Sequence, residues 1–346
     1  MKNFLCLCTV AILSLSVTTS TLYGAPKPKK HLGIATYSVK GLESDIEGSF
    51  KALADYGYLS MEISNYDAGK GNVAGFTPSD YADLSKKYNL AIISSHVRAK
   101  FDVKDVEGST TAWGKVFDDH KIMGCKYVIL PMNLWAGTVE GVKAECDLMN
   151  KIGEEANKRG IKFGYHNHSA EFVNIANTEY KYEDFLIDNT DPDKVVFELD
   201  VYWTTVGGQD PVVYLKKYPK RIKLLHIKDE YVLGETGKID FKAIFKQFYK
   251  NGNKDWFVEM EAKMSKEQRE QSMVFMEQMK QIQAKGGTMQ ELMTEMSKNR
   301  PKDDKGQQGG RGFGPQDPKL VAELLKTSLD GIKQSADYLI KSDFVK

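Results

Sequence analysis

Short apolar runs alternate with longer amphipathic stretches along residues 31–263 of this chain. The short runs are rich in β-branched and aromatic residues, as buried strands are. The longer stretches repeat apolar residues at the three- and four-residue spacing of a helix with one buried face. The pattern predicts eight strands, at residues 31–38, 58–64, 90–97, 126–132, 161–168, 195–202, 222–229 and 256–262.

Several predicted helices begin with residues that cap a helix N-terminus. Ser44 and Glu47 have the spacing of a capping box, in which each side chain bonds the backbone amide of the other residue. Thr77 and Asp210 each precede a proline, which is favoured at the first helical position. We therefore expect a helix after each of the first seven strands.

Eight strand–helix repeats predict an α/β fold, a (β/α)8 TIM barrel at residues 31–346 with a helical insertion after strand eight. A doubly wound open sheet is the alternative. That fold usually carries a glycine-rich phosphate loop after its first strand, and this chain has TYSVKG there. The barrel is favoured.

A Met- and Gln-rich segment at residues 264–316 interrupts the repeat. Capping boxes that begin at Ser265 and Thr288 predict two helices, and a flexible glycine-rich linker follows them. Asp317 precedes a proline and starts the last barrel helix, predicted at 320–340. A loop after a barrel strand emerges where barrel active sites lie, so this insert is a candidate lid or oligomer contact.

The N-terminus has the pattern of a secretory signal peptide. Lys2 is followed by an apolar run at residues 4–17, and small and polar residues then lead to Ala25. The run is too short to span a bilayer comfortably, and a buried N-terminal strand is the alternative. We expect residues 1–25 to be removed and the mature protein to be periplasmic or secreted, without stable membrane insertion.

Composition and cysteine content add little to this picture. The chain is 41% hydrophobic and 27% charged with a net charge of +1, so the overall charge does not indicate a nucleic-acid partner. We expect a small-molecule partner, and a homo-oligomer is open. Cys125 and Cys146 could pair in an oxidising compartment, but buried free thiols are an equally open interpretation.

Histidines and acidic residues gather at the C-terminal ends of the predicted strands. His166 and His168 lie two residues apart in strand five, so they share a face. His96 and His226 end strands three and seven. Carboxylates at strand ends are Glu62, Glu198, Asp200, Glu259 and Glu261. These ends converge on the mouth of a barrel, so we expect one site there.

Strand alternation directs these carboxylates into the barrel. Phe197 and Leu199 are predicted to face the helices, which turns Glu198 and Asp200 inward. Unpaired carboxylates are costly to bury together, and a divalent cation removes that cost. Mixed imidazole and carboxylate ligands favour Mn, Co, Zn or Fe over Ca and Mg. The alternative is that the histidines are structural and that Glu198 pairs with Lys228.

Residues 199–229, LDVYWTTVGGQDPVVYLKKYPKRIKLLHIKD, closely resemble the sugar phosphate isomerase/epimerase family with a xylose-isomerase-like barrel. GIATYSVKG, GYLSMEISNYD and GYHNHSAEF fit the same family. The resemblance covers about residues 31–263 and 317–341 and leaves the insert outside. The wider group includes inosose dehydratases, keto-hexose 3-epimerases, apurinic endonucleases and 3-keto-glycoside lyases.

The resemblance implies one divalent metal, held in the epimerase members by Glu, Asp, His and Glu at the ends of strands five to eight. His166 stands where those members have the first Glu, so either it replaces that ligand or the metal is displaced. Glu198, Glu62 or Glu261 would then complete the metal site. The implied metal ligands are His166, Asp200, His226 and Glu259, with Glu198 as an additional candidate.

The chemistry implied by the resemblance is removal of a proton next to a carbonyl. His168 is the first candidate base. Lys228 is the second, either as a base or as a cation beside the oxyanion, and Glu261 or Glu171 could protonate a leaving group. Trp203 stands where epimerases have a substrate-contacting histidine and offers a stacking face to a sugar ring. The candidate substrate contacts are Glu62, His96, Glu171, Trp203 and Asp229.

Export favours free sugars or oxidised glycosides over sugar phosphates as substrates. We therefore expect an exported metal-dependent lyase, hydratase or epimerase acting on 3-keto-sugars or 3-keto-glycosides. A ketose 3-epimerase or an inosose-dehydratase-like enzyme is the alternative. An endonuclease on this barrel would need a three-zinc site and a basic surface, which the charge argues against. A non-catalytic sugar-binding barrel stays open.

Overall fold

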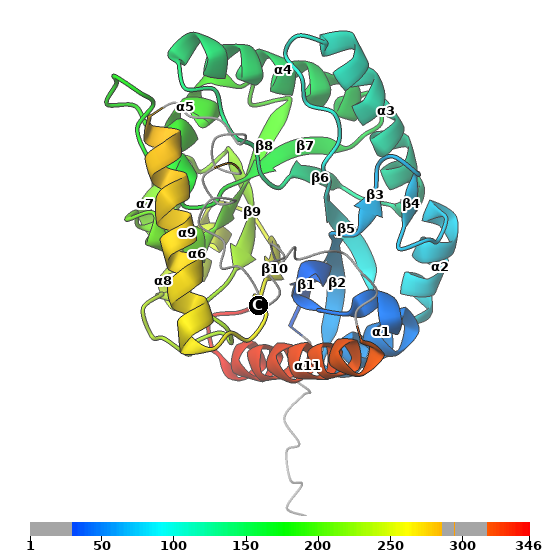
Figure 1. Cartoon of the computed structure of the whole chain (residues 1–346). Coiled ribbons are helices and arrows are strands. Elements are labelled where there is room, and N and C mark those ends of the chain that lie inside the picture. Colours follow the sequence, from blue (N-terminus) through cyan, green and yellow to red (C-terminus); the bar gives the residue numbers. More distant parts are fainter. Residues whose placement is uncertain (1–29, 286–293, 295–316) are drawn as a thin grey trace, which may run out of the picture.

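The computed structural model describes residues 30–285, 294 and 317–346, and it is a closed parallel barrel ringed by helices (Figure 1). The strands follow one another around the barrel in the order β1-β10-β9-β8-β7-β6-β5-β2. All eight predicted strands are present, and each ends before its expected boundary. They are β1 (Leu32–Ala35), β2 (Tyr58–Ile63), β5 (Ala91–His96), β6 (Tyr127–Leu130), β7 (Lys162–His166), β8 (Val195–Asp200), β9 (Ile222–Ile227) and β10 (Asp255–Val258).

Helices connect the strands on the outside of the barrel, so the predicted (β/α)8 fold is confirmed. They are α1 (Ile46–Asp55), α2 (Pro78–Lys87), α3 (Val106–Met123), α4 (Val139–Asn157), α5 (Tyr182–Asn189), α6 (Val201–Val206), α7 (Pro211–Lys217), α8 (Phe241–Lys250), α9 (Lys266–Ala284) and α11 (Pro318–Lys341). The last of these lies beside the first and closes the ring (Figure 1). A small antiparallel hairpin, β3 (Tyr66–Asp67) with β4 (Asn72–Val73), follows β2 and was not predicted.

The predicted capping box at the start of α1 is wrong by one residue. Asp45 is the N-cap and accepts a hydrogen bond from the Gly48 amide at 2.9 Å. Ser44 ends the short 3-10 turn η2 (Leu42–Ser44), and its hydroxyl donates to the Gly41 carbonyl at 2.7 Å. Because the Ser44 hydroxyl is bonded within this turn, Asp45 becomes the N-cap and α1 begins at Ile46.

The other predicted helix starts within the described residues are confirmed. Thr77, Asp210 and Asp317 each accept a bond from a backbone amide two or three residues later. Ser265 and Gln268 form the reciprocal capping box of α9, with bonds of 2.8 and 3.2 Å. The predicted signal peptide, the second helix of the insert and its linker lie outside the described residues.

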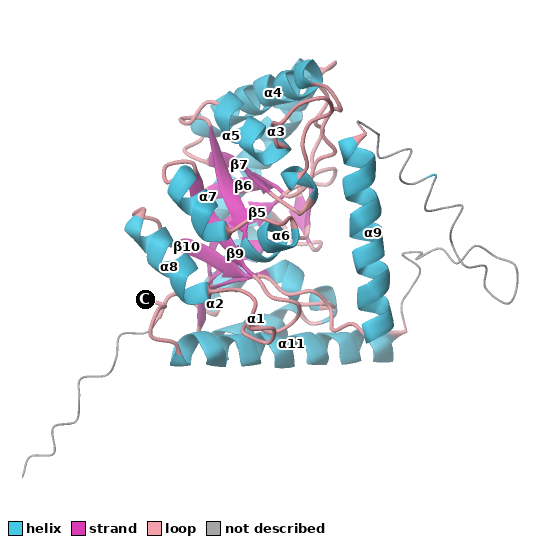
Figure 2. Cartoon of the chain, turned by 90° about the vertical axis from the view of Figure 1, so that its left-hand side faces the viewer, coloured by secondary structure: helices cyan, strands magenta, loops and turns pink. Residues whose placement is uncertain are grey.

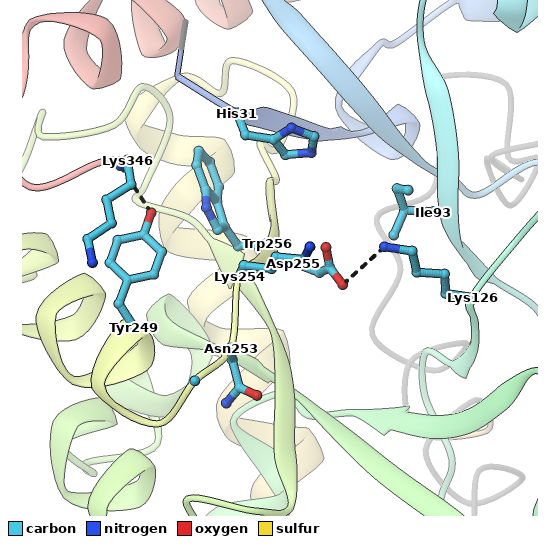
Figure 3. A pocket seen from close by; sticks show the side chains of 10 residues that line it. His31, Ile93, Lys126, Tyr249, Asn253, Lys254, Asp255, Trp256 and Lys346 are labelled. Carbon is cyan, nitrogen blue, oxygen red and sulfur yellow. Dashed lines mark hydrogen bonds and ion pairs between the residues drawn. The ribbon is translucent and has the colours of Figure 1, made fainter. Parts of the chain in front are cut away.

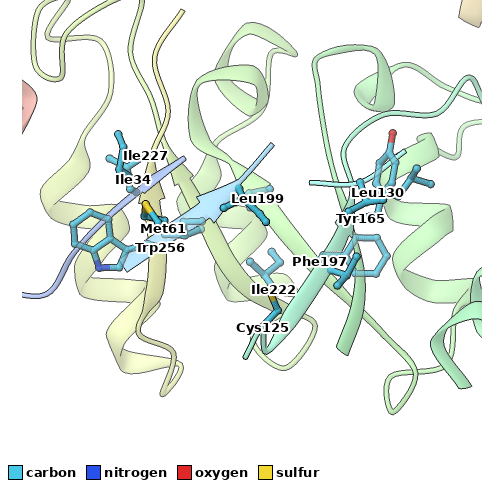
Figure 4. Close-up of a cluster of buried hydrophobic side chains, with 14 of the residues drawn as sticks. Ile34, Met61, Cys125, Leu130, Tyr165, Phe197, Leu199, Ile222, Ile227 and Trp256 are labelled. Atoms are coloured by element: carbon cyan, nitrogen blue, oxygen red, sulfur yellow. The ribbon is translucent and has the colours of Figure 1, made fainter. Parts of the chain in front are cut away.

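Two apolar layers enclose the polar strand ends. The larger layer lies between strands and helices, and Figure 4 shows Phe197 and Leu199 within it. This confirms the alternation predicted for β8. A smaller cluster lies inside the barrel and consists of Ala35, Ile129, Val196, Leu224 and Phe257. It fills the barrel interior with apolar side chains, as barrels of this type require.

Cys125 and Cys146 are both free and buried, so the thiol interpretation holds for this structure. Among the residues that the structure describes, no helix combines the length and apolarity that crossing a bilayer requires.

Candidate active site and metal centre

The strand ends bring imidazoles and carboxylates into one buried cluster. Neighbouring strands place Glu198 opposite His166, and Asp200 opposite His226. Glu62, Glu198, Asp200 and His226 are all 0% exposed. The convergence expected from the sequence is therefore present, and water is excluded from most of its charged atoms.

One part of the cluster, the inner group, consists of Glu62, His96, His166 and Glu198 on the Nε2 side of His226. His96 Nε2 lies 2.7 Å from Glu198 Oε2 and 3.1 Å from Glu62 Oε1. His226 Nε2 lies 2.6 Å from Glu62 Oε1. His166 Nδ1 is 3.3 Å from Glu198 Oε2. Two buried carboxylates are thus surrounded by three imidazoles.

The other part, the outer group, lies on the Nδ1 side of His226 and adds Asp200 and Glu259. His226 Nδ1 is 2.9 Å from Glu259 Oε2, and one donor atom of each of the three residues lies within 4.8 Å of the others. Lys228 Nζ continues the network, at 2.6 Å from Glu259 and 2.7 Å from Glu261. The imidazole of His226 therefore joins two groups that could each hold an ion.

Buried donor atoms without hydrogen-bond partners in the described part of the chain indicate where a cation would fit. They are Glu62 Oε2, Glu198 Oε1, Asp200 Oδ2 and His166 Nδ1. Each such atom costs about 1–3 kcal/mol if it stays unsatisfied. Coordination would satisfy them, and the mixed nitrogen and oxygen donors suit Zn, Mn, Co or Fe. Of the four predicted ligands, three belong to the outer group and His166 to the inner group.

The carboxylates differ in protonation because their neighbours differ. Burial raises the pKa of Glu198, and the Glu62 charge adds to it, giving about 7. Burial likewise raises the pKa of Asp200 to about 7. Burial would also raise the pKa of Glu259, but Lys228 and His226 outweigh it and hold that pKa well below its usual range. Without a cation, the cluster therefore mixes protonated and ionised carboxyl groups.

Asp200 is held in place by its role as the N-cap of α6. Its Oδ1 accepts from the Trp203 amide at 2.7 Å, which leaves Oδ2 unpartnered among the described residues. The side-chain oxygen of Asn167 accepts from the Asp200 amide at 3.0 Å. Sequence reasoning gave Asn167 no role, because strand alternation turns it away from its two histidine neighbours.

His168 and Trp203 lie beyond the cluster, towards solvent. The His168 ring centre is 5.0 Å from that of His166 and 5.7 Å from that of Trp203. Burial lowers the pKa of His168, and Lys228 adds to the effect, so the pKa falls to about 3. His168 is therefore neutral at physiological pH, and its Nδ1 has no partner in the described chain.

Two predicted substrate contacts hold loops in this structure. Glu171 is buried; its Oε1 accepts from the Tyr165 hydroxyl at 2.5 Å and its Oε2 from the His168 amide at 2.8 Å. Asp229 accepts from the Thr236 hydroxyl at 2.6 Å. A direct contact of either carboxylate with a substrate stays a prediction.

Tyr37 and Lys40 are site residues that sequence reasoning missed. The Tyr37 hydroxyl donates to Glu261 at 3.0 Å, and Lys40 Nζ lies 3.3 Å from the centre of the Tyr37 ring. Burial lowers the pKa of Lys40 to about 8. Tyr37 lies near the end of the first predicted strand, and this position could have identified it as a candidate site residue.

A cavity of about 560 Å³ opens beyond the cluster, and His168, Trp203 and Glu261 lie in its wall. Its opposite wall comes from α9, which stands along one side of the barrel beside α6 (Figure 2). A different cavity, of about 500 Å³, lies at the amino ends of the strands (Figure 3). Its polar contacts include the ion pair of Lys126 with Asp255 at 3.7 Å and the hydrogen bond from the Lys346 amide to the Tyr249 hydroxyl at 3.3 Å (Figure 3), at the barrel end associated with stability.

Comparison with known proteins adds the family. Residues 50–279 match the xylose isomerase-like TIM barrel family. This chain belongs to that family. A solved sugar phosphate isomerase/epimerase from Parabacteroides distasonis ATCC 8503 is 32% identical, with a TM-score of 0.70 over 92% of this chain and 100% of that one. The resemblance inferred from residues 199–229 is confirmed.

Curated relatives of this xylose isomerase-like barrel include inosose dehydratases. That of Clostridium botulinum (strain Alaska E43 / Type E3) is 25% identical over 259 residues, 63% of this chain and 82% of the relative. That of Clostridium tetani (strain Massachusetts / E88) is 29% identical over 133 residues, 32% of this chain and 43% of the relative. The family relatives are thus enzymes, at identities that leave the substrate of this chain open.

Proposed function

We propose that this protein is an enzyme that removes a proton from the carbon next to a carbonyl group of a sugar. One divalent cation would be held by Asp200, His226 and Glu259 of the outer group, whereas His166, the fourth ligand expected from the sequence, lies in the inner group. The observation that carries the proposal is the buried outer group, whose donor atoms lie within 4.8 Å of one another and in which Asp200 Oδ2 has no hydrogen-bond partner among the described residues. A bound divalent cation supplies Lewis-acid polarisation of a carbonyl and stabilises the negative charge that develops on its oxygen.

Glu62 orients His226 in this proposal. It lies 2.6 Å from Nε2, so a proton on Nε2 is held there and Nδ1 is left as the ligand atom towards Asp200 and Glu259. Ligating histidines commonly donate their second nitrogen to a carboxylate in this way. Glu62 was expected to contact substrate, and its full burial favours the orienting role instead.

His168 takes the proton from carbon. Its Nδ1 is unpartnered among the described residues, and it lines the cavity. Glu171 fixes the backbone at this position through its bond to the His168 amide. General bases are held by such contacts so that the reacting geometry is prepared in advance.

Lys228 acts as a cation beside the developing oxyanion and not as the base. Burial lowers its pKa, but Glu259 and Glu261 outweigh burial and raise the pKa well above its usual value. In an elimination, the proton on C2 passes to His168, the bond from C1 to its oxygen breaks, and C1 and C2 become doubly bonded. The departing oxygen takes a proton from solvent, because Glu261, which was expected to supply it, accepts hydrogen bonds from Lys228 and the Tyr37 hydroxyl. Burial would raise the pKa of Glu261, but Lys228 outweighs burial and lowers that pKa, so the carboxyl is ionised.

The preferred substrates are 3-keto-sugars or 3-keto-glycosides, because a keto group at C3 acidifies the C2 proton. Export, which the N-terminal pattern predicts, supports free sugars over sugar phosphates. An inosose-dehydratase-like or ketose 3-epimerase activity is the second candidate, and the curated relatives favour it. A non-catalytic sugar-binding barrel is the candidate of a different class.

Metal analysis and product analysis together test the proposal. We expect about one equivalent of transition metal in the purified protein and turnover of methyl 3-keto-β-glucoside with added Mn or Co. Asp200→Ala and His226→Ala should each lose metal and at least about a hundredfold in activity. His31→Ala, an exposed histidine away from the site, is the control.

Each outcome separates the candidates. Turnover of inosose or a ketohexose alone would move the function to the second candidate. A metal-free protein that binds the sugar without turning it over would support the binding barrel. Full activity in both Asp200→Ala and His226→Ala would contradict the proposed metal site.

A further inference from the structure

The cavity beyond the metal centre has two halves. His168, Trp203 and Glu261 form the half next to the cluster. The rest of the wall, the far half, carries apolar side chains of the insert and of neighbouring loops, namely Met132, Tyr231, Met264, Met273, Phe275 and Met276. Polar side chains also line it, namely Glu230, Lys266, Arg269, Glu270 and Ser272.

The wall of the cavity that α9 forms is fixed by contacts near both ends of the helix. The reciprocal capping box of Ser265 and Gln268 fixes the start of α9. Near the other end of the helix, Lys280 Nζ donates to the Val206 carbonyl of α6 at 3.1 Å, and Met279 is buried. One face of α9 between these two anchors lines the cavity, and it includes Met273, Phe275 and Met276 opposite the active site.

The size of the cavity also exceeds what the reacting ring needs. A volume of about 560 Å³ lies in the middle of the range of roughly 300–1,000 Å³ that holds drug-sized ligands. Trp203 is 8% exposed, lines this space, and has an indole N–H without a partner among the described residues. A buried, unpartnered donor in the wall indicates that a ligand completes the site.

We propose that the substrate carries an aromatic or similarly apolar group attached to its sugar, and that this group occupies the far half of the cavity between Tyr231 and α9. The inference rests on the proposed function, because the sugar half must lie at the metal centre. Methionine side chains adapt to differently shaped partners, so the surface suits a range of apolar aglycones. The family match extends through residue 279 and so includes most of α9, which thereby sets substrate preference.

Binding of two 3-keto-β-glucosides that differ only in their aglycone, 4-nitrophenyl or methyl, tests this inference. Calorimetry on the full-length metal-loaded protein should give at least about tenfold tighter binding of the aryl compound, since burial of an aromatic ring contributes at least this much. Phe275→Ala should reduce the ratio to about two or less. Met273→Ser, at a side chain that is 47% exposed, should reduce the ratio without affecting folding. Ile122→Ala, an exposed apolar residue on α3, should leave the ratio unchanged.

Failure of this inference and failure of the proposed function give different results. Equal affinity for the two compounds, with the methyl compound still turned over, overturns the aglycone site and leaves the proposed function standing. A ratio that Phe275→Ala and Met273→Ser both leave unchanged also overturns it. Binding and turnover of neither compound overturns both proposals. A dimer that dissociates in the α9 variants would assign the apolar surface to a second copy of the chain and overturn the inference.

Discussion

Glu62 decides which nitrogen of His226 faces the outer group. The two side chains lie 2.6 Å apart and both are fully buried, so no water can replace the carboxylate. In Glu62→Gln, an amide of nearly the same shape accepts more weakly and holds the imidazole less firmly. We expect metal affinity to fall by about 10- to 100-fold. Competitive chelator titration measures this, and unchanged affinity would remove Glu62 from its orienting role.

Glu145 gives a pH-dependent stability at a distance from the metal centre. It accepts from the Ala136 amide at 2.9 Å, and burial raises its pKa from an ordinary value of 4.5 to about 7. A raised carboxyl pKa means that the folded state holds the proton more tightly than the unfolded state does. Stability from this group is therefore full below pH 4.5 and is lost as pH rises towards 7.

The change Glu145→Gln removes this loss. The variant should match the wild type at pH 4.5 and be more stable at pH 8 by up to about 3 kcal/mol. Urea unfolding at the two pH values measures the difference, and Asp147→Asn, an exposed carboxylate of the same helix, is the control. A destabilised Gln variant at pH 8 would show that the charged form is the favoured one.

For single residues, the sequence predicted the orientation of some side chains and not of others. His166, Glu198, Asp200 and His226 lie on strands, where alternation by two determines the face, and all four point into the barrel as expected. Tyr37 lies in a 3-10 turn after β1, where no period applies, and it was missed. The sequence also did not predict which charged side chains form ion pairs. Lys228 was considered as a partner of Glu198, but it forms ion pairs with Glu259 and Glu261.

At the level of elements, the periodicity of apolar residues predicted every barrel strand. The ends of the elements were harder to predict, because neighbouring turns and helices compete for the same capping residues. The chain at Ser44 folded into a 3-10 turn and moved the cap of α1 to Asp45. The insert gave a correct helix start at Ser265 because a capping box is a local signal. Its position against the barrel mouth rests on contacts between distant residues, such as Lys280 with Val206, which a local pattern does not contain.

β1 closes the barrel against β10, and Gly33 permits the close approach. A Cβ atom there would lie 2.2 Å from the Trp256 carbonyl oxygen and 2.9 Å from a Phe257 ring carbon. Backbone cannot move aside as a flexible side chain can. Gly33→Ala should therefore lower the free energy of unfolding by about 1–3 kcal/mol, as overpacking does.

Denaturant unfolding measures the Gly33→Ala effect. Gly69→Ala is the matched control, because the contact there is only with the Asp67 side chain at 3.3 Å. We expect the control to stay close to the wild type. A Gly33→Ala protein as stable as the wild type would mean that β1 and β10 separate at little cost.

At the scale of the whole molecule, the N-terminal pattern predicts that the mature chain starts near residue 26. Expression in a Gram-negative host should yield a shortened protein in the periplasmic fraction. Intact mass measurement of that fraction identifies the new N-terminus. Changing the apolar run with Leu13→Arg should retain the full-length chain in the cytosol. A full-length wild-type chain in the cytosol would contradict export.

The metal site links binding to the stability of the whole barrel. Its ligands and their partners come from β2, β5, β7, β8 and β9 and from Glu259 just after β10, so a bound cation connects strands around the ring. Unfolding separates these strands and destroys the site. A cation at a hundred times its dissociation constant therefore stabilises the folded state by about 2.7 kcal/mol. For a protein of this size, that corresponds to a rise in Tm of about 3–5 °C.

Thermal unfolding with Mn, Co or Zn, and after removal of the metal by a chelator, measures this linkage. His226→Ala should show no rise in Tm, because it removes the residue that both groups share. Calcium should have little effect on the wild type, because it prefers six to eight oxygen ligands over imidazole. An equal rise in wild type and His226→Ala would place the binding elsewhere on the molecule. A rise in Tm that accompanies loss of metal would show that the buried carboxylates are already satisfied by their protons and ion pairs, and that the cluster is a structural network.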